Sequence, residues 1–411
     1  MKQIFFTKKN SLLLNIVIGL VVILILIAIP TGYEDALIYQ GTERAVGLVT
    51  EVDNSTVKTS GLIQSGEQSC KMRIQNGMFK GKEITGVNFL SGSLEKDKIY
   101  KVNDKAFVTI SYNDDQEITS AVMSDHFRLD KEILLLAVFA VFLVIVAGKN
   151  GFQAIFSFAI TVLTIWKVLV PTYLKGYSPV WVGILITTFL TVMIIFFVYG
   201  FDRRTVTASL GSLLGIMATC ILGIVFTDMF KIHGAVMPDS ESLLYSGFQD
   251  LNLTAIFMSS IFIGASGAMM DLSVDITSAI HEVVEKKPDI SWKEAARSGM
   301  NVGRAAMGTM TTTLLLAYSG GYVTLLMVFM AQGTPIDHIL NYKYVASEVL
   351  DTVVGSFGLV TVAPFTALTA GILLTKKEHS IKLLRLLKTE FWRKNKKTEE
   401  ISDIPAKNPM E

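Results

Sequence analysis

The sequence predicts a polytopic α-helical membrane protein with about eight transmembrane helices and a small all-β extracytoplasmic domain. The first observation is composition: 51% of the 411 residues are hydrophobic and the mean hydropathy is +0.47, which is more apolar than a soluble domain needs. The second is that the apolar residues gather into separate stretches of bilayer length. The third is a polar region near the N-terminus whose residues alternate as they do in strands.

The N-terminal segment, residues 1–30, has a basic leader followed by an apolar stretch from Leu12 to Ile29. A secretory signal peptide has the same order. However, this stretch is long enough to span a bilayer, and the sequence IPTGYED after it contains no small-residue cleavage site. We therefore expect an uncleaved transmembrane anchor.

Residues 31–131 contain no apolar stretch long enough to cross a bilayer. Five segments there alternate and are rich in β-branched residues: RAVGLVTEVD, SCKMRIQN, KEITGVNFL, DKAFVTISYN and EITSAVMSDHF. About five short strands in roughly 100 residues suit a small β-barrel or sandwich, of which the oligonucleotide/oligosaccharide-binding (OB)-like barrel is one form. We expect a structural or partner-docking module and no nucleic-acid partner, because no basic, aromatic-lined surface is indicated.

Residues 132–375 are mostly apolar and form a predicted seven-helix membrane domain. The apolar stretches cover residues 133–147, 152–170, 179–199, 206–226, 253–276, 305–331 and 345–374. With the N-terminal anchor they give eight spans. The stretch over 133–147 is short, so we expect a tilted or locally thinned crossing.

The distribution of Lys and Arg predicts the orientation of the spans. The N-terminal leader, two short turns, the loop over residues 281–304 and the tail over residues 376–411 are rich in Lys and Arg, so we place them inside. The alternate segments, which include residues 31–131, carry fewer. Both termini are therefore expected to be cytoplasmic and the β domain external. The tail also carries interspersed leucines, which favours an amphipathic helix on anionic lipid.

Two aspartates, Asp271 and Asp275, share one face of the sixth span because they lie four residues apart. Asp271 is about 18 residues past Leu253, which is roughly 27 Å along a helix. With about 30 Å of hydrocarbon, both acids lie toward the inner interface, at the level where Arg304 begins the seventh span. One interpretation is an ion pair with Arg304, and the other is a cation or proton site.

The same span contains the sequence GASG, which matches the G-x-S-G string of intramembrane serine proteases and would make Ser266 a nucleophile. That chemistry needs a histidine at the same depth, whereas the histidines nearby fall in loops or at span ends. Helix packing is the favoured interpretation. Gly264 and Gly267, like Gly299 and Gly303, allow neighbouring helices to approach closely.

The seventh span is rich in hydroxyl groups and contains a glycine break. Its threonines are Thr309, Thr311, Thr312 and Thr313, and the break is the sequence YSGG over residues 318–321. Hydroxyls beside a broken helix near the midplane are typical of transporters. A simple kink is the alternative.

An outer vestibule for a cation or substrate is a second candidate site. It contains His233 and Asp239 from the loop over residues 228–252, and Glu348 and Asp351 from the outer start of the last span. The alternative is a loop packed on the outer surface with solvated acids.

The sequence indicates no cofactor and no resident metal. Cys70 lies in a polar stretch and Cys220 in an apolar one, so a disulfide between them is not expected. No Cys/His cluster has zinc spacing, and no ATP-binding motif is present.

Three stretches together resemble the YibE/F family of bacterial membrane proteins: HGAVMPDSESLLYSGF, GASGAMMDLSVDITSAIHEV and KEAARSGMNVGRAAMGTMTTTLLLAYSGG. The resemblance covers about residues 130–375, and the preceding β domain resembles the longer, YibE-like members. It implies a bacterial plasma-membrane location and makes Asp271, Asp275 and Arg304 part of the family pattern. It implies no substrate, and it leaves open a second family subunit or a homo-oligomer as partner besides the lipid bilayer.

These patterns favour a non-enzymatic transporter or permease for a small solute or ion, with Asp271, Asp275, Arg304 and the threonines as its core. The first alternative is a non-transporting membrane scaffold or envelope sensor that acts through its external β domain. The second is an intramembrane hydrolase that depends on Ser266.

Overall fold

The structure is a computed structural model that describes residues 8–34 and 41–402, with side chains over 14–34 and 41–375. It contains two compact units. One covers residues 32–151, and the other contains the N-terminal helix and the chain from residue 152 onward. The first unit is thus longer than the predicted β domain, because it includes the helix that follows the strands.

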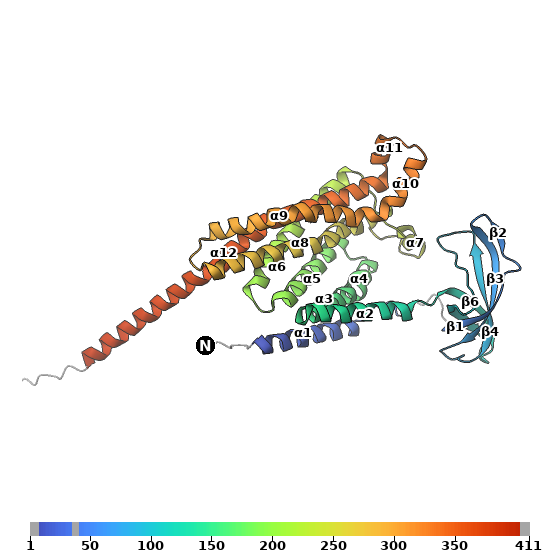
Figure 1. The fold of residues 1–411 in the computed structure, drawn as a ribbon, viewed down its shortest axis with the longest axis horizontal. Helices are drawn as coiled ribbons and strands as arrows, with labels where there is room; N and C mark the ends of the chain where they lie inside the picture. The colour runs from blue at the N-terminus through green and yellow to red at the C-terminus, as the bar shows by residue number, and fades with distance from the viewer. Residues whose placement is uncertain (1–7, 35–40, 403–411) are drawn as a thin grey trace, which may run out of the picture. The chain divides into compact units, whose positions relative to one another are not determined.

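The strands form a closed barrel (Figure 1). They are β1 (Thr42–Asp53), β2 (Lys58–Ser60), β3 (Ile63–Ile74), β4 (Glu83–Ser91), β5 (Lys105–Tyr112) and β6 (Ile118–His126). Strand β1 pairs antiparallel with both β3 and β5, while β4 meets β6 in parallel at Val87 and Val122. Without the short β2, this is the five-stranded Greek-key connectivity of an OB-type barrel. The predicted small β-barrel is confirmed.

The barrel core follows from the alternation of its strands. Along β5, Ala106, Val108 and Ile110 point inward and are fully buried. Met72 of β3 fills the space beside Gly86 of β4, where an added Cβ would lie 2.5 Å from the Met72 Cε atom. The glycine therefore makes room for the larger side chain in the barrel centre.

Helix α2 (Leu129–Ala147) follows the barrel directly. Asp130 and Glu132 lie in its first turn, where negative charge is favourable for the helix dipole. The apolar residues 133–147 come next, and none of the helix is buried. These fifteen residues are about 22 Å long, which is short for a span.

The remaining elements are helical. They are α1 (Lys8–Ala28), α3 (Lys149–Thr164), the π-helical turn η1 (Ile165–Leu169), α4 (Val170–Leu174), α5 (Pro179–Tyr199), α6 (Arg203–Met229), η2 (Gly234–Val236), α7 (Ser240–Tyr245), α8 (Leu253–Lys286), α9 (Trp292–Ser319), η3 (Gly320–Tyr322), α10 (Val323–Ala331), α11 (Ile336–Asn341) and α12 (Lys343–Ser402).

Within the described residues, six helical segments are long and apolar enough to cross a membrane. They are Lys149–Leu174, Pro179–Tyr199, Arg203–Met229, Leu253–Lys286, Trp292–Ala331 and Lys343–Thr375. The predicted helical membrane protein is confirmed, but the count of eight is not. The apolar part of α1 covers only Leu14–Ala28, and α2 opens with three charged residues.

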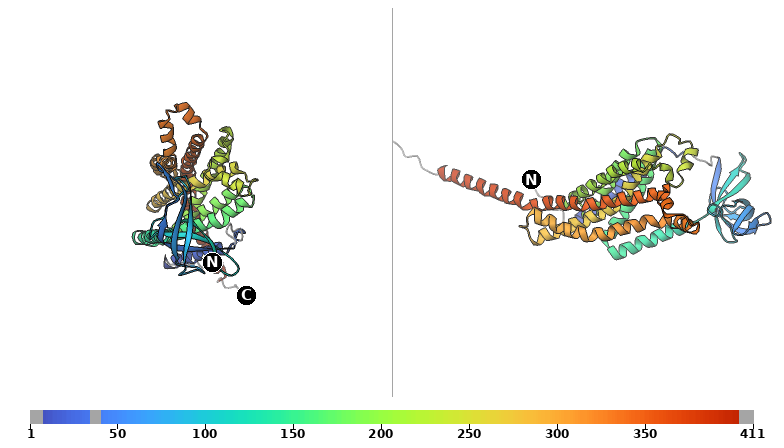
Figure 2. Two further views of the ribbon diagram at one scale, coloured as in Figure 1. Left: turned by 90° about the vertical axis from the view of Figure 1, so that its right-hand side faces the viewer. Right: turned by 90° about the horizontal axis from the view of Figure 1, so that it is seen from above.

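Helices α6, α8 and α12 form the centre of the membrane unit and approach closely at glycines. A Cβ on Gly211 of α6 would collide with Thr366 of α12, and one on Gly358 of α12 would collide with Thr219 of α6. Small residues at such crossings are how membrane helices pack. Helices α8, α9 and α12 pack against one another and lie side by side in Figure 1 and in the right-hand view of Figure 2.

Helix α9 lies at the edge of this group. Its buried Gly299 and Gly303 pack on Ile276 and Ile280 of α8. Only 11% of the apolar stretch of the α9–α10 segment is buried, against 50% for α8 and α12. The helix therefore presents most of its surface outward.

Helix α12 continues past the membrane segment to Ser402. The side chains of the predicted amphipathic tail beyond Thr375 lie outside the described residues, as do those of the basic N-terminal leader.

Candidate functional site

Two acids in the first turns of α12 face the interruption between α9 and α10. Glu348 and Asp351 lie three residues apart and so share a helix face. Tyr322 lies close enough to the Glu348 carboxylate for the two groups to influence each other. Tyr318 lies close enough for the charges of both acids to act on it. We call these four residues the acid–tyrosine cluster.

The interruption determines where the two tyrosines lie. Helix α9 ends at Ser319, the 3-10 turn η3 follows, and α10 begins at Val323. No atoms approach the positions where Cβ atoms would be on Gly320 and Gly321, so these glycines do not serve close packing. Their low helix propensity favours an interruption at this point. The tighter 3-10 turn changes the direction of Tyr322 relative to Tyr318.

Three polar atoms of the cluster are sealed from solvent, although the four residues are only half-buried as a whole. Glu348 Oε1, Asp351 Oδ1 and the Tyr318 hydroxyl are buried and have no hydrogen-bond partner within the described part of the chain. Over the same residues, neither carboxylate takes part in an ion pair. A buried carboxylate without a counter-charge is costly unless a proton or a cation neutralises it.

Helix α8 closes the third side of the cluster. A Cβ on Gly264 would lie 2.7 Å from the Tyr318 hydroxyl oxygen. One turn past Asp351, a Cβ on Gly355 would lie 3.1 Å from the Ala265 Cβ atom. Gly264, which was predicted to serve helix packing, thus brings α8 close to Tyr318 of α9, and Gly355 and Ala265 bring α8 and α12 close together beside the acids.

The predicted inner-leaflet group does not form one site. Gly303 packs on Ile276, so the neighbouring residues Arg304 and Asp275 lie at the same depth. They nevertheless have different neighbours: Arg304 lines a hollow of about 230 Å³ with Pro364 of α12, whereas Asp275 lies near Tyr199 of α5. Asp271, Asp275 and Arg304 are all exposed, and the expected ion pair does not occur among the described residues.

The threonines of α9 use their hydroxyl groups within their own helix. Thr309 donates to the Ala306 carbonyl at 3.0 Å, and Thr313 donates to the Thr309 carbonyl at 3.0 Å. Thr311 and Thr312 make similar bonds one turn back. These hydroxyl protons are therefore satisfied without a substrate.

His233 and Asp239 shape the outer loop and do not join Glu348 and Asp351. The His233 ring accepts a hydrogen bond from the Ala235 backbone N–H at 3.2 Å, and Asp239 has a left-handed backbone at φ 57°. Both side chains are exposed. No group of three metal-ligating side chains occurs among the residues that the structure describes.

Ser266 is buried at 7% exposure, and its hydroxyl donates to the Ile263 carbonyl at 2.7 Å. This is a bond within helix α8 and not a contact with a histidine. Gly267, next to it, is exposed and has open space where a side chain would be.

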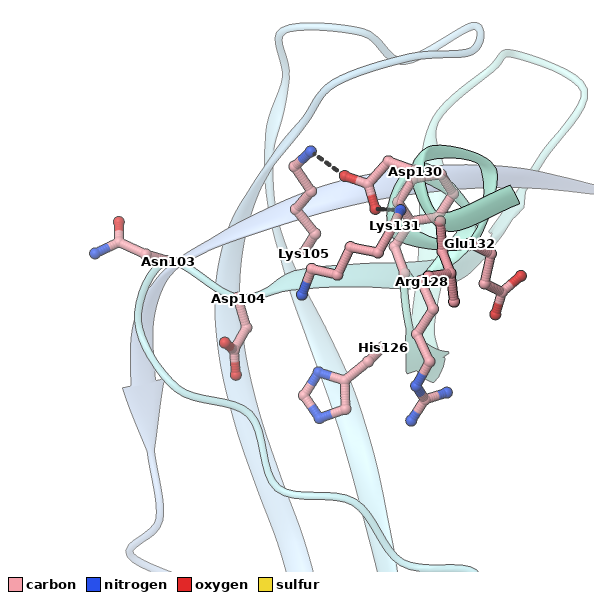
Figure 3. Close-up of a pocket in the computed structure, with 10 residues that line it drawn as sticks. Asn103, Asp104, Lys105, His126, Arg128, Asp130, Lys131 and Glu132 are labelled. Atoms are coloured by element: carbon pink, nitrogen blue, oxygen red, sulfur yellow. Dashed lines mark hydrogen bonds and ion pairs between the residues drawn. The ribbon is translucent and has the colours of Figure 1, made fainter. Parts of the chain in front are cut away.

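The barrel unit has a hollow of its own, of about 730 Å³, where β5, β6 and the start of α2 meet (Figure 3). Its lining is highly charged and includes Asp104, Lys105, His126, Arg128, Asp130 and Lys131. Lys105 pairs with Asp130 at 2.8 Å, and this contact lowers the pKa of the Asp130 carboxyl. The His126 ring lies 4.5 Å from the Tyr100 ring. The ion pair ties strand β5 to α2, and the ring contact ties the end of β6 to the loop between β4 and β5.

Family comparison accounts for most of the chain. The sequence model of the YibE/F-like protein family matches residues 135–376, and that of the YibE/F family N-terminal domain matches residues 38–125. The chain belongs to the YibE/F family. Neither the curated proteins nor the solved structures gave a match. The first YibE/F match contains the whole acid–tyrosine cluster, and the second contains strands β1 to β5.

Sequence reasoning about this YibE/F-family protein missed Tyr318 and Tyr322. Both flank the glycine break at a spacing of four residues, and an acid pair stands at the outer end of the next span. This combination of two tyrosines, a glycine break and an acid pair was the signal in the sequence that could have indicated the cluster. It could not show that the two segments face each other, because their contact depends on how α9 and α12 cross.

Proposed function

We propose that this protein is a non-enzymatic plasma-membrane transporter or permease for a small cation, or for a small solute whose movement is coupled to a cation or proton. In the proposed topology eight helices cross the membrane, with α1 and α2 added to the six long spans. Both termini are cytoplasmic and the β-barrel is external. The excess of Lys and Arg in the predicted inner segments supports this orientation.

The acid–tyrosine cluster is the observation that carries the proposal. Its two carboxyl groups lie in a membrane-spanning helix, and each has a sealed oxygen atom without a protein donor. Intramembrane acids of this kind mark ion and proton pathways. Carboxylate oxygens are also the ligands that hard cations prefer.

The helix break gives the cluster a means of opening. Tyr322 belongs to the 3-10 turn and lies close to Glu348, so a change in that turn alters the surroundings of the acid directly. Interrupted helices form the binding sites of many transporters for this reason. In the proposed cycle, a cation or proton that enters from one side neutralises the acids, and movement of the turn releases it to the other side.

The test is ion movement into liposomes that contain the purified full-length protein and a trapped pH-sensitive dye. External Na⁺, K⁺, Mg²⁺ or Mn²⁺ is added in turn. We expect at least one cation to change the internal pH with the natural protein. Asp351→Asn and Glu348→Gln should abolish that change, because each removes a carboxylate charge that binds the transported cation or proton.

Asp337→Asn is the matched control, because Asp337 is an exposed acid of α11 on the same predicted side. It should leave the ion movement intact. Equal ion movement with the natural protein and with Asp351→Asn would contradict the proposed role of the cluster.

A scaffold or sensor role is the second candidate function, and the independent barrel unit favours it. The barrel has its own hydrophobic core and a charged hollow at the base of α2. Deletion of residues 31–130 separates the two functions. Ion movement that survives the deletion supports the transporter, and a cellular phenotype that needs only the barrel supports the sensor.

A further inference from the structure

Helices α8 and α9 present charged and small residues outward along one surface, which we call the α9 face. On the α8 flank it carries Asp271 and Asp275, in the middle Ala305, Gly308 and Thr312 of α9, and on the α12 flank Arg304. All six residues are exposed. The order across the face is therefore acid, small residues, base.

Lipid is an unsuitable neighbour for this face. Asp271 lies roughly 27 Å along α8 from Leu253, within the ~30 Å hydrocarbon layer. Neither Asp271 nor Asp275 has a hydrogen bond or ion pair inside the described part of the chain. Charged side chains at this depth face protein or water, because lipid cannot stabilise them. Helix α2 cannot supply a partner charge, since residues 133–147 are all apolar.

We propose that the α9 face is the contact surface of a homodimer, with a second copy related by a two-fold axis along the membrane normal. Rotation by 180° about that axis keeps every residue at its depth and exchanges the two flanks. It therefore places the acid flank of one copy opposite the Arg304 flank of the other. Asp275 and Arg304 already lie at one depth, because Gly303 packs on Ile276.

The middle of the face suits the same arrangement. No atom lies within 4 Å of where a Cβ would be on Gly308, so the backbone of α9 is accessible to a neighbouring helix. Small residues let two such helices approach closely. A two-fold contact is self-complementary, so one surface supplies both halves of the interface. Two Asp275–Arg304 contacts per dimer then pair the Asp275 and Arg304 charges of both copies.

The test is cysteine crosslinking of the full-length protein in membranes. The natural cysteines, Cys70 and Cys220, are both buried, so the unmodified chain serves as the background. Thr312→Cys should give an oxidised product with the mass of two copies. Ile221→Cys is the control: Ile221 is 58% exposed on α6, which packs against α8 and α12 on the other side of the bundle. It should give none.

Charge reversal tests the pairing itself. In the Thr312→Cys chain, Asp275→Arg or Arg304→Asp alone should abolish the crosslink, because like charges then face each other across the axis. The double variant Asp275→Arg/Arg304→Asp should restore it, which also shows that both substitutions are compatible with the fold. Absence of the Thr312→Cys crosslink would overturn the proposal. So would an equal crosslink from Ile221→Cys, a product of a different mass, or single reversals without effect.

Discussion

A single carboxylate, Asp97, holds the loop between β4 and β5 in place. It accepts hydrogen bonds from the backbone N–H groups of Ser91 at 2.9 Å, Gly92 at 2.7 Å and Ser93 at 3.0 Å, and from the Ser91 hydroxyl at 2.9 Å. The hydrogen bond from the Ser91 backbone is the main reason why the pKa of Asp97 lies below its ordinary value of 3.8. Such a group stabilises the fold above the unfolded pKa and loses its effect as pH falls through the lowered folded value.

The Cys70 thiol can report this loss of stability at low pH. It is buried in the barrel core, so a reagent reaches it only when the barrel opens. Burial, and then the charge of Asp104, raise the pKa of the Cys70 thiol to about 11. We expect a disulfide reagent that works at acid pH to modify Cys70 slowly at pH 6 and faster below pH ~3.8. Asp97→Asn should speed the modification already at pH 6.

Asp114→Asn, in the β5–β6 turn, is the control for this measurement and should behave like the natural protein. Mass spectrometry of the Cys70 peptide gives the rate. An unchanged rate in Asp97→Asn would show that the loop does not depend on this carboxylate.

The membrane acids show which part of a residue's setting can be predicted from sequence. The depth of Asp275 beside Arg304 follows from counting along helices, and the structure places them level. Their directions do not follow from counting, because the rotation of α8 and α9 depends on which glycines meet which isoleucines. For the same reason the outer pair, Glu348 and Asp351, could be noticed but its burial beside two tyrosines could not.

Among the elements, the barrel strands were predictable because alternation is a local property. The closing contact of β4 with β6 was not, since it joins Val87 to Val122 across a long separation in sequence. The six long membrane segments were predictable from apolar length. The prediction that α1 and α2 also span the membrane depends on the charges that flank them. The YSGG break was also visible, because glycines interrupt a helix through local backbone freedom.

Replacing the glycines of η3 tests the break at the scale of the element. The double variant Gly320→Ala/Gly321→Ala should fit without a clash, since no atoms surround either position. Alanine favours a helix over glycine by ~1 kcal/mol per residue, so α9 and α10 should become more continuous. That change turns Tyr322 away from Glu348.

We therefore expect this double variant to lose cation-dependent ion movement in liposomes while its melting temperature in detergent stays equal or rises. Gly223→Ala in α6 is the matched control, because its Cβ would lie 3.8 Å from the Ile261 Cδ1 atom, an ordinary contact. It should retain full ion movement. Normal ion movement in the η3 variant would show that the break is only a kink.

At the scale of the whole molecule, the chain joins two units of different physical character. The barrel closes its own sheet and leaves few strand edges exposed, whereas the membrane unit depends on close helix contacts at glycines. Both units match the YibE/F family. The membrane unit holds the acid–tyrosine cluster, so the ion handling that we propose belongs to it, and in this proposal the barrel serves as an external accessory.

The central claim is that Glu348 and Asp351 are neutralised by an exchangeable proton or cation. Infrared difference spectroscopy of the reconstituted protein reads the charge state of carboxyl groups directly. We expect a carboxyl signal that changes when pH is raised or a transported cation is added. It should disappear in Glu348→Gln/Asp351→Asn but persist in Asp337→Asn. Identical spectra from the natural protein and the Glu348→Gln/Asp351→Asn variant under all these conditions would contradict it.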